Sequence, residues 1–381
     1  MRVLHLVGLL ATGMSASAGA QKPETWLTKL GNDTVAFERF TRTGDRLEGD
    51  YVVVVPRLRI NKYLVSFNPD GTVKHYQYSS RAAVEAAGAP PSVEATATFG
   101  DGAVVALITR GGRTDTVRVA AGHALPNALY AWGLFGLATE AARRIPGDSA
   151  VVEQWGIGAR QVTKTAVSRR GDSLAVDFFG SPMMVAADAR GRPSAVNGGR
   201  TTVKVLAARV DRLDLSALTE AFAARERAGQ IAGALSPRDT IVATVRGAAV
   251  WVDYGRPSKR GRQLYGGIVP YDQVWRTGAN AATQIRFDRP LQIGGAAVPA
   301  GTYTLWTLPT TRGVKLIINK QVGQWGTEYD PSRDLVRVDA DVEKLDDLVE
   351  RFTISVVDGA NQGELRFDWD HTRWVVRFSA R

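Results

Sequence analysis

Hydrophobic and polar residues alternate with a period of two over much of residues 21–210. Asp33–Arg42 places Val35 and Phe37 between polar neighbours, and Tyr63–Tyr78 has two alternating arms around Pro69-Asp70-Gly71. A period of two is typical of a strand with one buried face, and a glycine in the turn accepts positive φ. The pattern therefore predicts a meandering antiparallel sheet.

One segment of this region has a different pattern. Leu125–Arg144 is apolar on nearly every side up to Thr139, with Pro126 suited to a first helical turn and two arginines at the far end. A helix that is hydrophobic all round is usually buried, so we expect the sheet to curve around it as a half-barrel. The helix then either fills the half-barrel as core or leaves an apolar ligand cavity beside the sheet.

A second helix is predicted where the alternation stops. Asp214–Gly229 places Leu215, Leu218 and Phe222 on one face and ends in glycine. The segment Gln230–Pro237 that follows is small and turn-prone. We therefore expect a β-rich domain over 21–210, a helix and linker over 211–237, and another domain over 238–381.

The C-terminal region again predicts short strands between Gly, Pro, Asn or Asp residues. The expected strands are Ile241–Asp253 with a turn at Gly247, Gln284–Phe287, Leu291–Ile293, Thr302–Leu308, Val314–Asn319, Phe352–Val357, Glu364–Trp369 and Trp374–Phe378. Short strands with turns about ten residues apart are typical of a β-sandwich or jelly roll. The acidic run Asp339–Glu350 is expected to be a solvated surface.

The N-terminus predicts export. Arg2 precedes the apolar run Val3–Met14, and Ala18-Gly19-Ala20 stands before Gln21. These are the three regions of a secretory signal peptide, here residues 1–20, so we expect a periplasmic or secreted protein. The apolar run is too short for a transmembrane anchor, which needs about 20 residues. The chain has no Cys, which excludes disulfides and thiolate chemistry.

The formal net charge of +10 is unevenly distributed. Residues 254–320 hold ten Lys/Arg against two Asp/Glu, a net of +8, and residues 321–370 hold five against thirteen, a net of −8. Adjacent blocks of opposite sign are expected to neutralise each other. Nucleic acid is therefore not an expected partner, because phosphate binding needs unpaired cations.

The stretch Tyr254–Thr283 combines five cations with four aromatic rings among turn-forming residues. Rings can stack on a planar or sugar-like ligand, and arginines donate bidentate hydrogen bonds to anions. This composition predicts a site for a carbohydrate or small anionic ligand, without a cofactor or metal. The predicted ligand-binding residues are Tyr254, Arg256, Arg260, Trp275, Arg276 and Asn280.

Three carboxylates offer alternatives to that hypothesis. Glu328, Asp330 and Asp334 could pair with the arginines of 256–276, or serve as the acid/base pair of a hydrolase. Whether the protein is an enzyme stays open, because no G-x-S-x-G, H-E-x-x-H or P-loop motif is present. Asp368-Trp369-Asp370-His371 has metal-ligand residue types, but strand alternation favours a solvated outer face. A third alternative is a structural docking domain for another envelope protein.

Several long motifs carry a family resemblance. VDYGRPSKRGR, GGIVPYDQVWRTGANAAT, VPAGTYTLWTLP and NKQVGQWGTEYD occur in this order from Val252 onward. In these motifs the chain resembles the domain of unknown function 2911 family over about 236–360. The resemblance implies an exported β-rich domain and brings no established activity. No family resemblance is recognised over residues 21–210.

Overall fold

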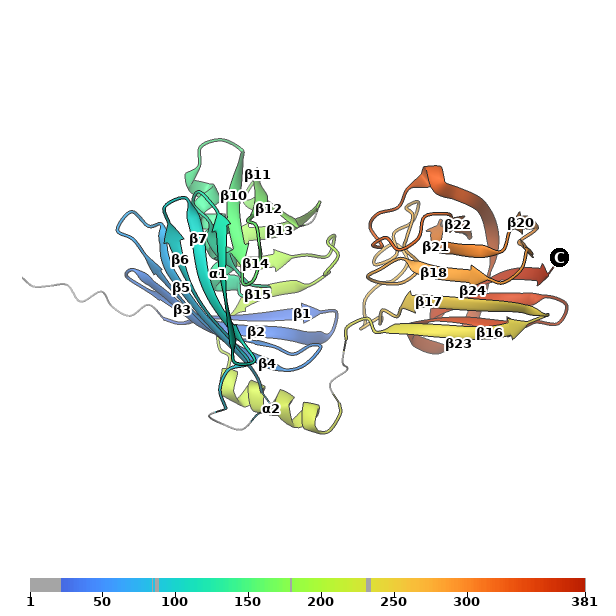
Figure 1. Cartoon of the computed structure of the whole chain (residues 1–381), viewed down its shortest axis with the longest axis horizontal. Helices are drawn as coiled ribbons and strands as arrows, with labels where there is room; N and C mark the ends of the chain where they lie inside the picture. Colours follow the sequence, from blue (N-terminus) through green and yellow to red (C-terminus); the bar gives the residue numbers. More distant parts are fainter. Residues whose placement is uncertain (1–21, 84, 86–88, 179, 231–233, 381) are drawn as a thin grey trace, which may run out of the picture.

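The computed structural model describes residues 22–83, 85, 89–178, 180–230 and 234–380. The predicted signal peptide, residues 1–20, lies outside this part of the chain. The described residues form two large sheets and two α-helices (Figure 1). The predicted fold class, mainly β, is confirmed.

The N-terminal sheet has 15 strands in the order β8-β7-β6-β5-β4-β3-β2-β1-β15-β14-β13-β12-β11-β10-β9. Its strands are β1 (Glu24–Leu30), β2 (Asp33–Thr43), β3 (Arg46–Val53), β4 (Arg59–Phe67), β5 (Val73–Ala82), β6 (Val93–Gly100), β7 (Ala103–Arg110), β8 (Arg113–Ala120), β9 (Leu125–Asn127), β10 (Ser149–Gly156), β11 (Thr163–Arg170), β12 (Ser173–Phe178), β13 (Ser181–Ala187), β14 (Pro193–Asn197) and β15 (Leu206–Val210). Neighbouring strands are antiparallel, as predicted, except that β9 and β10 run parallel.

The C-terminal sheet has nine strands in the order β16-β17-β18-β21-β22-β23-β24-β19-β20. Its strands are β16 (Arg238–Val245), β17 (Ala248–Gly255), β18 (Thr283–Phe287), β19 (Leu291–Ile293), β20 (Ala296–Val298), β21 (Gly301–Pro309), β22 (Val314–Asn319), β23 (Asp334–Asp358) and β24 (Gly363–Ala380). The acidic run Asp339–Glu350, expected as solvated surface, is largely exposed but belongs to the long strand β23.

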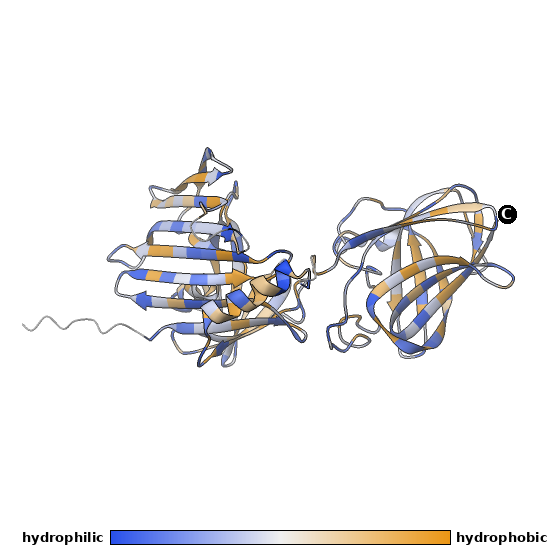
Figure 2. Cartoon of the chain, turned by 90° about the horizontal axis from the view of Figure 1, so that it is seen from below, coloured by the Kyte–Doolittle hydropathy of each residue, from blue (hydrophilic) through white to orange (hydrophobic). Residues whose placement is uncertain are grey.

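Local turn chemistry explains where the hairpins form. β4 and β5 pair through the predicted turn, in which Gly71 has a φ of 83° and the Asn68 amide donates to the Thr72 carbonyl over 2.8 Å. β16 and β17 meet at Arg246 and Gly247, both with positive φ. Figure 2 shows hydrophobic and hydrophilic bands alternating along the strands, as the period-two pattern requires.

The buried helix is shorter than predicted. α1 spans Trp132–Arg144, whereas residues 125–127, expected in its first turn, form β9. Pro126 lies opposite Trp155 at the edge of the sheet, a place where a residue without an N–H is tolerated. The helix therefore begins where the chain leaves this edge strand.

α1 touches strands that lie far apart in the sheet. A side chain at Gly133 would collide with the Tyr63 hydroxyl of β4, and one at Gly136 would come within 3.3 Å of Pro193 of β14. Between β4 and β14 the sheet order places β3, β2, β1 and β15. Trp132 also stacks on Trp26 of β1, with ring centroids 5.7 Å apart. The helix is thus covered by one face of the N-terminal sheet.

Glu38 of β2 fixes the start of α1. Its carboxyl oxygens accept hydrogen bonds from the Trp132 amide at 2.6 Å, the Gly133 amide at 3.2 Å and the Tyr63 hydroxyl at 2.8 Å. Glu38 is completely buried. Burial raises the pKa of Glu38 to about 8, although the three hydrogen bonds lower it. The helix start is therefore tied to a carboxyl group that titrates near neutral pH.

The second helix, α2 (Leu215–Arg227), confirms the prediction for Asp214–Gly229. The Asp214 side chain caps it by accepting from the Ala217 amide. Its apolar face packs on the opposite side of the N-terminal sheet from α1, where Phe222 stacks on Phe37. Figure 1 shows α2 below this sheet, before the chain continues into β16.

The C-terminal sheet folds back over its own core. The hydroxyl of Tyr254, in β17, accepts a hydrogen bond from the Ile354 amide of β23 over 3.0 Å. Three strands, β18, β21 and β22, separate β17 from β23 in the sheet order. One hydrophobic cluster joins residues from both ends of this order. The sheet must therefore bend, which brings the loops after β17 close to β23.

We expect Glu38→Gln to remove a pH dependence of stability. Between pH 4.5 and 8 the unfolded chain carries an ionised Glu38 and the folded protein a protonated one, so folding takes up a proton and stability falls as pH rises. The free energy of unfolding of the wild type, relative to the glutamine variant, should drop by up to about 4 kcal/mol from pH 5 to pH 8. Urea unfolding at both pH values measures this. The control is Glu48→Gln, at an exposed carboxylate of β3, which should keep the pH dependence of the wild type. The prediction is contradicted if the free energy of unfolding of Glu38→Gln changes with pH as much as that of the wild type.

Candidate functional site

Two rings of the predicted site belong to the core of the C-terminal sheet. Tyr254 is only 1% exposed, and its hydroxyl bonds to the backbone of Ile354. Trp275 stacks on Trp369 with centroids 5.8 Å apart, and its edge meets Phe352. Both rings are therefore covered by other side chains and stabilise the fold.

Arg256 is fully engaged by its own sheet. Its guanidinium forms an ion pair with Asp239 of β16 at 2.9 Å. It also donates to the Phe352 carbonyl at 3.2 Å and to the Thr353 hydroxyl at 2.8 Å, both on β23. Arg256 thus fastens the end of β17 to strands on either side.

Arg260 joins the two sheets. Its side chain is 8% exposed and forms an ion pair with Asp33, at the start of β2. Its carbonyl accepts a hydrogen bond from the Asn32 amide at 3.0 Å, and its own amide donates to the Glu350 carboxylate at 2.7 Å. These contacts hold the β1–β2 turn against the loop that follows β17.

Arg276 is different from the other two arginines. It is half-buried, yet among the described residues its guanidinium has no ion pair and no hydrogen bond. Its stem lies against Gly326, where any side chain would collide with it. Its nitrogen atoms nevertheless reach solvent. Burial lowers the pKa of Arg276, the mark of a cation whose lost hydration no partner has replaced.

Two exposed groups lie beside Arg276. The Asn280 carbonyl accepts from the Gly326 amide at 2.9 Å, which brings the exposed Asn280 next to Trp325. Trp325 is 48% exposed. We name Arg276, Asn280 and Trp325 the Arg276 patch. Arg276 and Asn280 were predicted from the sequence; Trp325 was missed, and its only signal is an aromatic residue between polar and glycine neighbours outside any strand.

Two further cations, Lys204 and Arg262, lie near the patch. Lys204 lies in the loop before β15, and burial lowers its pKa together with the charges of Arg276 and Arg262. Burial also lowers the pKa of Arg262 to about 10. Among the described residues, the Arg262 guanidinium donates only to the carbonyls of Lys259 and Ser258. Positive charge from both sheets is therefore concentrated near Arg276.

The carboxylates proposed as partners of these arginines have other roles. Asp334 accepts from the Asn319 amide at 2.8 Å and the Tyr329 hydroxyl at 2.7 Å, and it pairs with Arg337. Asp330 caps the short helix η1 (Pro331–Arg333) by accepting from the Ser332 amide. The expected pairing of these carboxylates with Arg256, Arg260 and Arg276 is wrong: Arg256 and Arg260 pair with Asp239 and Asp33 instead. Asp330 and Asp334 pair with Arg333 and Arg337, and no ion pair joins Arg276 to Glu328 among the described residues.

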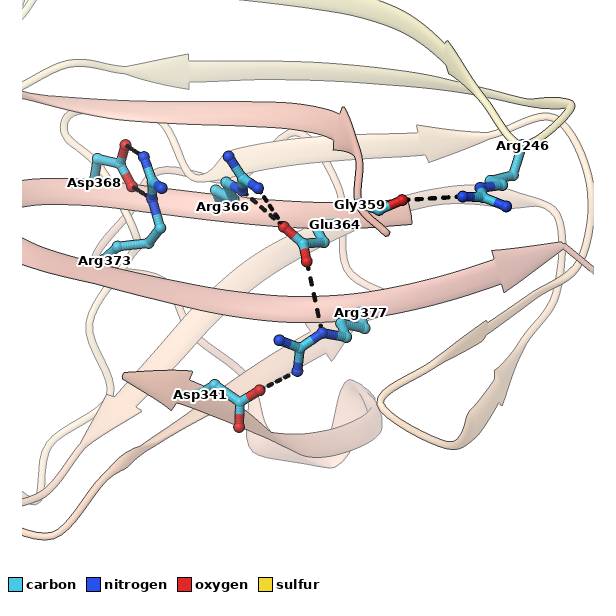
Figure 3. A network of polar contacts seen from close by, with 8 residues as sticks. All are labelled: Arg246, Asp341, Gly359, Glu364, Arg366, Asp368, Arg373 and Arg377. Atoms are coloured by element: carbon cyan, nitrogen blue, oxygen red, sulfur yellow. Dashed lines mark hydrogen bonds and ion pairs between the residues drawn. The ribbon is translucent and has the colours of Figure 1, made fainter. Parts of the chain in front are cut away.

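Other carboxylates of the acidic block are also satisfied within their own strand pair. Figure 3 shows Asp368 held by Arg373 at 2.8 Å, and Glu364 held by Arg366 at 2.6 Å. In the same network Asp341 pairs with Arg377. The blocks of opposite charge do meet at Lys259–Asp370 and Lys315–Asp339. Three carboxylates of the acidic block, Asp341, Glu364 and Asp368, are instead neutralised by arginines of β24.

The Asp368–His371 segment shows no metal geometry within the described part of the chain. Asp368 and Asp370 pair with Arg373 and Lys259, and Trp369 points into the core. No group of three or more Asp, Glu or His residues with the spacing of a metal site occurs among the residues described. Within the same residues, neither helix combines the length and apolarity needed to span a membrane.

Comparison with known families identifies the C-terminal sheet. Residues 236–378 match the model of the family described as "Protein of unknown function (DUF2911)", which confirms the resemblance found in the sequence motifs. The match includes the whole Arg276 patch. The N-terminal region has no family match, and no curated protein matches the chain.

Removal of the charge should destabilise the protein at Arg256 but have little effect on its stability at Arg276. Methionine keeps an apolar stem at either position. We expect Arg256→Met to lower the free energy of unfolding by about 1–3 kcal/mol, because Asp239 and two β23 acceptors lose a donor. Arg276→Met should change it by less than about 0.5 kcal/mol. Denaturant unfolding of both variants measures the difference; equal losses would show that Arg276 has a structural partner after all.

Proposed function

We propose that the protein is exported and binds a small anionic ligand with a stackable face, such as an acidic sugar, at the Arg276 patch. The observation that carries this proposal is the half-buried guanidinium of Arg276, which has neither ion pair nor hydrogen bond among the described residues. A cation without a partner gains free energy when an anion supplies the missing acceptors.

The neighbours of Arg276 suit both the stackable face and the anionic group of such a ligand. The exposed ring of Trp325 offers a stacking surface for a sugar or planar group. The exposed Asn280 adds an amide that can donate and accept hydrogen bonds. Lys204 and Arg262 add positive potential that favours an anion over a neutral ligand.

Two alternative functions, a hydrolase and a docking domain, are supported by fewer observations. For a hydrolase, Glu328 is the candidate acid or base: it lies beside Trp325, whose amide is 3.4 Å from its carboxylate, and it has no ion pair within the described residues. Asp330 and Asp334 both have arginine neighbours. For a docking domain, the exposed side chains of Val322 and Trp325 would be the contact.

The proposal includes a finer description of the architecture. The N-terminal sheet would be a half-barrel domain around α1, and the folded-over C-terminal sheet a jelly-roll-like sandwich domain, separated by α2 and the linker before β16. The separate cores of the two sheets support this division. The ligand patch would then lie on the C-terminal domain, close to its neighbour.

The proposed site is tested by titration with galacturonate oligosaccharides, with neutral galactose oligosaccharides as the uncharged comparison. We expect Arg276→Met to weaken binding of the acidic series tenfold to a hundredfold, since a charge-assisted bond contributes about 1.5–3 kcal/mol. Trp325→Ala should weaken both series, because it removes the stacking surface.

The matched control is Arg286→Ala, which removes an exposed arginine next to Trp251 in the same sheet. This variant should bind like the wild type. If neither series binds the wild type, or if Arg276→Met binds the acidic series unchanged, the proposed site is refuted. Isothermal titration calorimetry reports both outcomes directly.

Export is tested separately. When the full chain is expressed in a bacterium, intact-mass analysis should find a mature protein that begins at Gln21 in the periplasm or the medium, because cleavage follows Ala18-Gly19-Ala20. A cell-associated product that retains residues 1–20 would contradict the prediction.

A further inference from the structure

A cavity of about 410 Å³ lies on the N-terminal sheet beside α1. Its apolar lining comes mainly from the sheet and the helix: Phe40, Leu47, Trp132, Leu137 and Pro193. Ligand pockets commonly have this size and an apolar lining with a few polar groups. The floor is rigid, because Glu38 holds the backbone of Trp132 in place.

The rim of the cavity is strongly cationic. Six arginines line it against two glutamates, Glu24 and Glu140. Arg209 pairs with Glu24 at 2.8 Å, and Arg42 pairs with Glu140 at 2.9 Å. Both lining carboxylates are therefore already occupied, and they do not balance the remaining arginines.

Two rim arginines keep their guanidinium groups free. Arg143 and Arg190 have no ion pair and no side-chain hydrogen bond among the residues that the structure describes. Arg143 stands in the last turn of α1, where its charge also suits the helix end. Arg190 lies in the β13–β14 turn and has no such role. Two chain segments thus bring unpaired cations to one cavity whose lining is partly apolar.

We propose that this cavity binds an amphipathic carboxylate: the carboxylate is held by Arg143 and Arg190, and its apolar body lies against Trp132, Phe40 and Leu137. A planar carboxylate matches the fork geometry of a guanidinium. The apolar lining accounts for the rest of the ligand, because a site for a small inorganic anion has no use for it. This site is separate from the Arg276 patch, which lies on the C-terminal sheet.

The test uses the full mature chain and three probes in calorimetric titrations. Octanoate has both an apolar body and a carboxylate, 1-octanol has only the apolar body, and acetate has only the carboxylate. We expect octanoate to bind at least tenfold more tightly than either of the others. Arg143→Gln/Arg190→Gln should weaken octanoate binding at least tenfold and leave 1-octanol unchanged.

Two control variants test whether the loss of octanoate binding is specific to the arginines of the cavity. Arg118→Gln removes an exposed arginine of β8, which does not line it, and Arg276→Met alters only the other proposed site. Both should bind octanoate like the wild type. Circular dichroism checks the fold, and the single variant Arg190→Gln, in an exposed turn, serves if the double variant is unstable. The proposal is overturned if octanoate does not bind, if either partial probe binds equally well, or if the arginine variants bind unchanged.

Discussion

The hydrogen bonds of Glu38 are the interaction on which the N-terminal fold depends. The first amides of a helix lack acceptors within the helix, and the residue before α1, Ala131, has no side chain that could cap them. Glu38 supplies the acceptor from β2, while Tyr63 of β4 bonds to the same carboxyl group. One side chain therefore holds the helix start over two strands. Placing a carboxyl group there has a desolvation cost, and its raised pKa records that cost. Because Trp132 and Gly133 also line the cavity, the same bonds fix the cavity floor.

The presence or absence of a partner separates structural from candidate functional arginines in this chain. Arg256 and Arg260 look like ligand-binding residues in the sequence, but each guanidinium donates to acceptors on two different segments of the structure. A guanidinium that already pairs with a carboxylate gains little from an anionic ligand, even though the buried Nε of Arg260 has no hydrogen-bond partner among the described residues. Arg276 and Arg190 differ from them, since neither guanidinium pairs with a carboxylate among the described residues. Arg190 lines a cavity whose two glutamates pair with other arginines. The amino-acid composition alone does not distinguish the arginines that have partners from those that lack them.

The structural features that were predicted correctly from the sequence are those that depend on residues close together in the chain. The turn at Gly71, the capped helix after Asp214 and the hairpin at Gly247 all follow from local turn and cap chemistry. The start of α1 was misplaced, because the apolar pattern does not show that Pro126 pairs at a sheet edge. The partners of the arginines were missed for a related reason: Arg260 meets Asp33 and Arg256 meets Thr353 across long stretches of chain. Such contacts are set by how the sheets bend, which leaves no local pattern.

The contact between the sheets also affects how the Arg276 patch would work. The family match includes Arg276 and Trp325 but begins at residue 236, so Lys204 and Asp33 lie outside it. Lys204 adds positive charge near Arg276, and Asp33 holds Arg260 and with it the loop that carries Arg262. An anion at the patch would therefore interact with charges contributed by both sheets. Since charge interactions extend over about 8–10 Å at moderate ionic strength, the N-terminal sheet can strengthen anion binding without touching the ligand. In the proposed function, the C-terminal sheet would provide the specific contacts, and the N-terminal sheet would provide part of the field that attracts the anion.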